Sequence, residues 1–156
     1  MKWMIASFSP TGTTKKVAKA VAEGAGCAVL DVDLTDLEAV KNVARLDETA
    51  VLLAAVPVYQ GRVPAVALER LKEIRGNGRY AVALVVYGNR EYEDALLELK
   101  NALEKNGFQV AAAGAFVAEH SIVRSMASGR PDETDIRTAE KFGADIQKKI
   151  NGVQDI

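Results

Sequence analysis

Five short apolar runs alternate with helix-like stretches along the chain, and this alternation limits the folds that the sequence can adopt. The runs are residues 3–7, 28–33, 50–56, 80–87 and 110–117. Residues 51–56 and 81–86 are continuously apolar, which is typical of parallel strands covered on both faces. Between the runs, apolar residues recur every three or four positions, as on one face of a helix. The sequence therefore predicts an α/β fold with a doubly wound parallel sheet.

Glycines are expected to close several of the helices. Gly24, Gly76 and Gly107 each follow a helical periodicity, where a residue in the left-handed conformation commonly ends a helix. Gly143 instead falls on the apolar face of the last predicted helix. The only cysteine, Cys27, lies between a predicted helix and a strand and is expected to be a small buried apolar residue.

Composition narrows the class of protein. The 156 residues are expected to form a single domain, 1–156, with 49% apolar and 26% charged residues. The net charge of -1 argues against a nucleic-acid partner, which would select a basic face. No apolar stretch is long enough for membrane insertion, and the N-terminus shows no signal-peptide cleavage site, so a cytoplasmic protein is expected. One cysteine excludes an intrachain disulfide and an iron–sulfur cluster held by cysteines of one chain.

The candidate binding residues lie in three predicted loops. In doubly wound sheets, ligands bind beyond the carboxyl ends of the strands, near the point where the strand order reverses. The loop after the first strand contains Ser9, Pro10, Thr11, Gly12, Thr13 and Thr14 and leads into a helix. Amides at a helix N-terminus attract an anion, and the hydroxyls can donate to phosphate oxygens. The alternative interpretation is that one hydroxyl caps the helix and the others are incidental.

Other phosphate-binding motifs do not match this loop. The nucleotide P-loop requires two glycines followed by a lysine, and the dinucleotide fingerprint requires three glycines. A cysteine phosphatase would need a cysteine in the loop, but Cys27 lies beyond the helix. A receiver domain would need aspartates where the first and third strands end, and those positions are Ser7 and Val56.

The first loop resembles the phosphate loop of the flavodoxin family, Ser/Thr-x-Thr-Gly-x-Thr, and residues 9–14 match it position for position. The resemblance implies a three-layer doubly wound sandwich with a five-stranded parallel sheet in the order 2-1-3-4-5. It also implies FMN as the cofactor, with the phosphate held by neutral hydroxyls and amides.

The other two loops resemble the ring-binding loops of the same family. The second contains Pro57, Val58, Tyr59, Gln60, Gly61 and Arg62, and the third contains Tyr87, Gly88, Asn89, Arg90 and Tyr92. By resemblance, Tyr59 and Tyr92 cover opposite faces of the isoalloxazine ring. Stacking on a flat ring contributes about 0.5–1.5 kcal/mol per pair beyond the buried area. Residues 61–64 and 88–96 are most similar to the flavodoxin-like domain of anaerobe flavodoxin–ferredoxin fusion proteins, here expected without the ferredoxin part.

The resemblance implies an FMN-binding electron-transfer protein that shuttles electrons between redox partners, such as a reductase or a ferredoxin-type donor. No side chain is then needed as an acid, a base or a nucleophile, and a monomer or weak dimer is expected. Arg62 and Arg90 introduce cations near the ring, which should raise the flavin's reduction potential. The alternative is that both arginines point to solvent, where their charges are screened. An FMN-dependent NAD(P)H:quinone-type oxidoreductase is the alternative, and a binding module without flavin is a third possibility.

Overall fold

The computed structural model describes residues 2–42, 51–59, 61–88, 94–117 and 131–154. Strands and helices alternate through these residues: β1 (Lys2–Ser7), α1 (Thr13–Ala25), β2 (Ala28–Asp33), α2 (Leu37–Asn42), β3 (Val51–Pro57), α3 (Ala65–Leu71), β4 (Tyr80–Tyr87), α4 (Ala95–Lys105), β5 (Gln109–Val117) and α5 (Glu133–Gln154). The strand bounds predicted from the apolar runs are confirmed to within a residue at each end.

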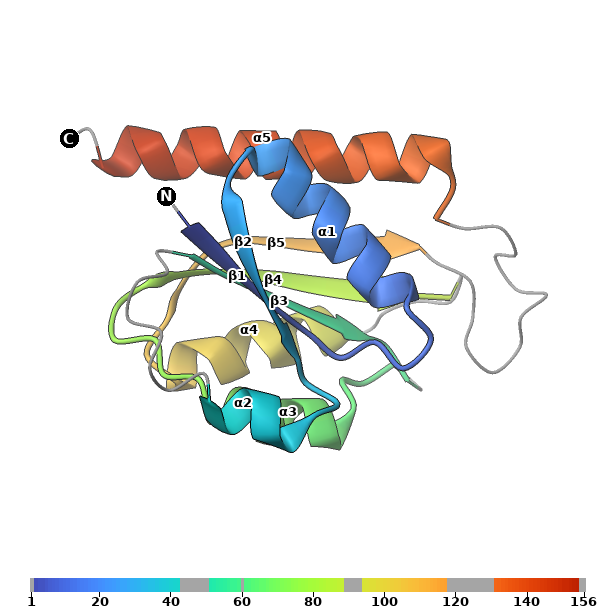
Figure 1. Cartoon of the computed structure of the whole chain (residues 1–156), viewed down its shortest axis with the longest axis vertical. Coiled ribbons are helices and arrows are strands. Elements are labelled where there is room, and N and C mark those ends of the chain that lie inside the picture. The colour runs from blue at the N-terminus through green and yellow to red at the C-terminus, as the bar shows by residue number, and fades with distance from the viewer. Residues whose placement is uncertain (1, 43–50, 60, 89–93, 118–130, 155–156) are drawn as a thin grey trace.

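The sheet has five parallel strands in the order β2-β1-β3-β4-β5, which confirms the predicted fold class. The chain places β2 on one side of β1 and all later strands on the other side (Figure 1). The strand order therefore reverses between β1 and β3, where a doubly wound sheet opens a crevice for a ligand.

Helices cover both faces of the sheet. Helices α1 and α5 lie on one face, and α2, α3 and α4 lie on the other (Figure 1). Successive residues of a strand point to opposite faces, so β1 contributes Trp3 and Ile5 to the core under α1 and α5 and Met4 to the core under the other helices. Both faces of the central strands β3 and β4 are buried, which explains why these two strands are continuously apolar rather than alternating.

The glycine predictions need two corrections. Gly24 lies inside α1 instead of after it, and Gly26 closes that helix with a left-handed φ of 70°. Gly76 is not left-handed either, whereas Gly107, just beyond α4, has a φ of 90° as predicted. Gly24 is a packing residue, because a Cβ placed there would lie 1.8 Å from the carbonyl oxygen of Glu140 on α5.

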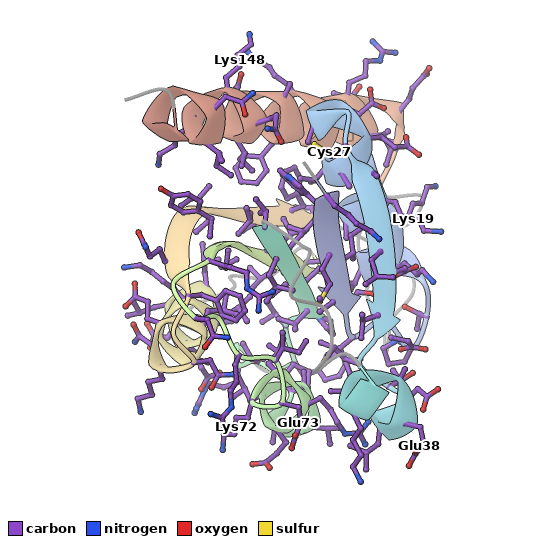
Figure 2. The ribbon with its side chains drawn as sticks, turned by 60° about the vertical axis from the view of Figure 1, so that its left-hand side comes forward. Lys19, Cys27, Glu38, Lys72, Glu73 and Lys148 are labelled. Atoms are coloured by element: carbon purple, nitrogen blue, oxygen red, sulfur yellow. The ribbon has the colours of Figure 1, made fainter. Side chains whose placement is uncertain are left out.

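Cys27 also differs from its prediction as a small buried apolar residue. It is half-buried where β2 begins, beside α5 (Figure 2), and its thiol donates a hydrogen bond to Gln147 Oε1 at 3.0 Å. Trp3 Nε1 donates to the same oxygen at 3.1 Å. Gln147 therefore links the first two strands to α5 through polar contacts.

Candidate functional site

The sheet topology brings two of the predicted loops to one edge. β1 and β3 are adjacent and parallel, so the residues that follow them emerge side by side. The amide of Phe8 donates to Ala55 at 3.0 Å, and the amide of Val58 donates to Val86 of β4 at 3.0 Å. Tyr87 ends β4 at the same edge and Gly88 follows it. Gln60, Asn89, Arg90 and Tyr92 lie outside the described residues.

The first loop is a tight turn that is anchored to the start of α1. Gly12 precedes the helix with a left-handed φ of 87°, which glycine adopts without a steric penalty. The amide of Gly12 donates to the carbonyl of Ser9 at 3.2 Å. The Ser9 hydroxyl accepts a hydrogen bond from the amide of Lys15 at 3.0 Å. Ser9 therefore braces the turn against the first turn of the helix.

The outer side of this turn is open and rich in hydrogen-bond donors. A Cβ placed on Gly12 would have no atom within 4 Å. Thr11 and Thr13 place their hydroxyls 3.2 Å apart above the helix N-terminus. Among the residues that the structure describes, none accepts a hydrogen bond from the amides of Thr13 or Thr14. The exposed Pro10 has no amide to offer, and the side chain of Thr14 is buried.

One of the two lysines in the first turn of α1 is paired with an acidic residue of β2. Lys15 Nζ lies 2.9 Å from Asp31 Oδ2 on β2, and this hydrogen bond raises the pKa of Lys15 above its ordinary value of 10.5. The Lys15 charge is thus shared with Asp31. The free amides and the helix dipole supply a positive field, and the arrangement fits a phosphate monoester that is bound from outside.

The second loop is a closed turn between Tyr59 and Arg62. The Tyr59 amide donates to the Arg62 carbonyl at 2.9 Å, and the Arg62 amide donates to the Tyr59 carbonyl at 3.0 Å. Gly61 has a φ of 76° and is buried, so the turn depends on a residue without a side chain. Tyr59, two residues after β3, is half-buried.

Glu98 on α4 contacts this turn, and sequence reasoning did not identify it. Its Oε2 accepts hydrogen bonds from Nε of Arg62 at 3.0 Å and from the Nη2 group of the same side chain. Its Oε1 accepts from the amide of Val63 at 2.9 Å. Arg62, followed by the Val63 amide, holds the pKa of Glu98 below its ordinary value of 4.5. No local pattern indicates a contact between residues 36 positions apart, and an acid in a first helical turn is common for its own reasons.

A hollow of about 800 Å³ lies between α3 and α4. Arg62 and Glu98 are among its lining residues, but Tyr59 and the first loop are not. Among the described residues of the three predicted binding loops, Arg62 is the one that lines the hollow. Within the described residues there is no cluster of side chains suited to a metal ion, and no helix combines the length and apolar character needed to cross a bilayer.

Comparison with known proteins supports the assignment of the fold. A family model described as flavodoxin matches residues 5–143. A flavodoxin from the domain Archaea is 16% identical with a TM-score of 0.65, and the match covers 97% of this chain and 99% of that one. A Streptococcus pneumonia TIGR4 flavodoxin is 18% identical with a TM-score of 0.65, covering 96% and 99%.

A longer protein contains the same fold as one part. Rubredoxin oxygen:oxidoreductase from the anaerobe Desulfovibrio gigas is 16% identical with a TM-score of 0.70 over 97% of this chain, but only 36% of that enzyme is covered. The comparison with curated proteins gave no match.

Proposed function

This chain belongs to the flavodoxin family, and we propose that it shuttles electrons between redox partner proteins by means of a non-covalently bound FMN. FMN is the cofactor of this family, and FMN-dependent electron transfer is its general role. The observation that carries the proposal is the open turn at the N-terminus of α1, which lies beside the Tyr59 turn at the strand-order reversal. The residues present fit the cofactor: a donor-rich cradle for its phosphate and a half-buried aromatic for its ring.

The first loop is proposed to hold the phosphate. The hydroxyls of Thr11 and Thr13 and the amides of Thr13 and Thr14 donate to its oxygens. Gly12 leaves room for close approach, since nothing occupies the space above it. Ser9 fixes the turn through the Lys15 amide. Hydrogen bonds to a charged group are about twice as strong as those between neutral groups, so this cradle should contribute a large share of the affinity.

The second and third loops are proposed to hold the ring. Tyr59 stacks on one face, and the backbone of Pro57, Val58 and Gly61 forms the wall of the site beside it. Tyr87 and Gly88 begin the opposite wall. Asn89, Arg90 and Tyr92, with Gln60 of the second loop, lie outside the described residues and stay predictions. FMN supplies the electron-transfer chemistry when bound, and the residues of the chain bind it, orient it and exclude water from the ring.

Other properties follow as parts of the same proposal. We expect one domain, a monomer or weak dimer in solution and a cytoplasmic location. Sedimentation of the FMN-loaded protein tests the oligomeric state. NAD(P)H oxidation with a quinone as acceptor distinguishes the electron carrier from the oxidoreductase, because only the oxidoreductase turns over with these small molecules alone.

The test is a titration of the FMN-free protein with FMN and with riboflavin, which lacks the phosphate. Thr11→Ala combined with Thr13→Ala should weaken FMN binding by about a hundredfold or more, since each of the two lost hydrogen bonds to the phosphate contributes about 1.5–3 kcal/mol. Riboflavin binding should not change. Thr138→Ala on α5 is the matched control, because its hydroxyl bonds only within the helix, to Thr134. Wild-type protein that takes up no FMN, or a double variant that binds it normally, would overturn the proposal.

A further inference from the structure

Glu98 uses both carboxylate oxygens on the segment that closes the second loop. Oε2 accepts from Arg62, and Oε1 accepts from the amide of Val63 at 2.9 Å. Arg62 and Val63 follow Gly61 directly, so the carboxylate fixes the chain where it leaves the turn. Arg62 is also the residue whose amide and carbonyl bond to Tyr59. A continuous chain of contacts thus runs from Glu98 through Arg62 to Tyr59.

The helix that carries Glu98 is held rigidly in the core. Ala95 and Leu99, on either side of it in α4, are fully buried, and the Glu98 amide donates to Asp94 at 2.8 Å. Only 20% of the Glu98 side chain is exposed, which limits competition from water for its hydrogen bonds. A carboxylate on a packed helix can therefore restrict the segment from Arg62 to Val63, in addition to the packing of the Val63 side chain into the core.

Glu98 makes contacts that its position in the first turn of a helix does not explain. An acid near a helix N-terminus is stabilised by the dipole without contacting another element. Glu104 on the same helix shows the ordinary case, because it pairs with Lys100 one turn away at 3.4 Å. Glu98 instead reaches a different loop and accepts from a backbone amide there. Such a contact holds backbone geometry, and a simple surface ion pair would not.

We propose that Glu98 is a positioning residue for the ring-binding loop: its carboxylate, on Arg62 and the Val63 amide, holds the Tyr59–Arg62 turn in the shape that receives the flavin. The inference rests on the proposed function. Because the turn is held before FMN arrives, binding avoids part of the entropy cost of ordering the loop. Glu98 therefore increases the affinity for FMN indirectly, by holding the Tyr59–Arg62 turn.

The test compares Glu98→Ala, Glu98→Gln and the matched control Glu104→Ala. The first readout is amide hydrogen exchange of Val63 in the FMN-free protein, which needs no cofactor. The second is the FMN dissociation constant. Glu98→Ala should accelerate Val63 exchange and weaken FMN binding by about tenfold each, the effect of losing one hydrogen bond to a charged group. Glu98→Gln should largely restore both, because its amide oxygen can still accept from Val63.

The outcomes separate the inference from the proposed function. Protein that takes up no FMN would contradict the proposed function, and Val63 exchange would still report on the loop. The inference is overturned when Glu98→Ala behaves as Glu104→Ala does in both readouts, or when Glu98→Gln fails to restore them. If Glu98 only stabilised the fold, Glu98→Ala would lower the free energy of unfolding, and Glu98→Gln would not restore slow amide exchange of Val63. If Glu98→Ala does not fold, Glu98→Asp replaces it, since the shorter side chain cannot reach both partners.

Discussion

Arg62 is a cation in the ring-binding loop, and the sequence alone suggested that it raises the flavin's reduction potential. In the structure its guanidinium is paired with Glu98 and its side chain is 68% exposed. The positive charge of Arg62 and the negative charge of Glu98 therefore largely offset each other at the proposed position of the ring. Arg62→Ala should therefore lower the potential, because it leaves the Glu98 carboxylate without its partner near a site that gains negative charge on reduction. Redox titration measures this, and the exposure of Arg62 keeps the shift modest.

The double variant gives the decisive comparison for Arg62. Arg62→Ala with Glu98→Gln removes both charges and should return the potential close to that of the wild type. Lys72→Ala is the control, because Lys72, directly after α3, pairs with Glu69 of that helix and not with a residue of the binding loops. A double variant whose potential stays as low as that of Arg62→Ala would mean that Arg62 acts as an unpaired cation.

The lowered pKa of Glu98 predicts how stability depends on pH. A group whose pKa falls on folding stabilises the protein above its unfolded pKa, and this contribution disappears as the pH falls through the lowered folded value. Glutamine cannot titrate. The difference in free energy of unfolding between wild type and Glu98→Gln should therefore be largest near pH 7, shrink as the pH falls below the ordinary value of 4.5, and vanish once the pH is below the lowered pKa of the folded state. Urea denaturation at several pH values measures it, and a difference that grows on acidification would contradict the Arg62–Glu98 pairing.

At the scale of elements, α1 and α5 approach each other through glycines. A Cβ on Gly143 would lie 1.8 Å from the carbonyl oxygen of Val21, and one on Gly24 equally close to that of Glu140. Because these contacts are with backbone, side-chain movement cannot relieve them. Gly143→Ala should reduce the free energy of unfolding by about 1–3 kcal/mol or more. Gly152→Ala on the same helix meets nothing within 4 Å and should add about 0.5–1 kcal/mol. Chemical denaturation of both variants checks the prediction; equal stabilities would contradict the close helix packing.

The elements themselves were predictable to different degrees. The strands were found because each is a short, mainly apolar run, and the two central strands, β3 and β4, are apolar almost throughout because both of their faces are buried. The helix ends were less predictable, because Gly24 satisfies the local pattern of a helix end while packing decides its role. Gly24 lies inside α1 because the close contact with the Glu140 backbone requires a residue without a side chain there. Gly26, two residues later, closes the helix instead. Local sequence contains no information about which helix will lie against Gly24.

At the scale of the whole molecule, the common position of the first two loops was predictable because topology constrains it. Parallel strands bring the ends of β1 and β3 together, so the first two loops meet wherever the sheet forms. Glu98 was not predictable, because its contact with Arg62 depends on how α4 packs beside the segment after β3. The same packing creates the hollow between α3 and α4. Sequence motifs therefore indicate the groups that we propose to touch a ligand more readily than the groups that hold those loops in place.

The proposed binding loops continue from strands of the core. Ligand binding is therefore coupled to the stability of the whole fold. FMN that binds only the folded chain should add about 2.7 kcal/mol at a hundredfold excess over its dissociation constant, raising Tm by roughly 5–10 °C for a protein of this size. Riboflavin at the same concentration should raise Tm less, because it leaves the Thr11–Thr13 turn without an anion. Calorimetry with each ligand measures both shifts. An equal rise with riboflavin would assign the affinity to the ring loops and contradict the phosphate cradle at α1.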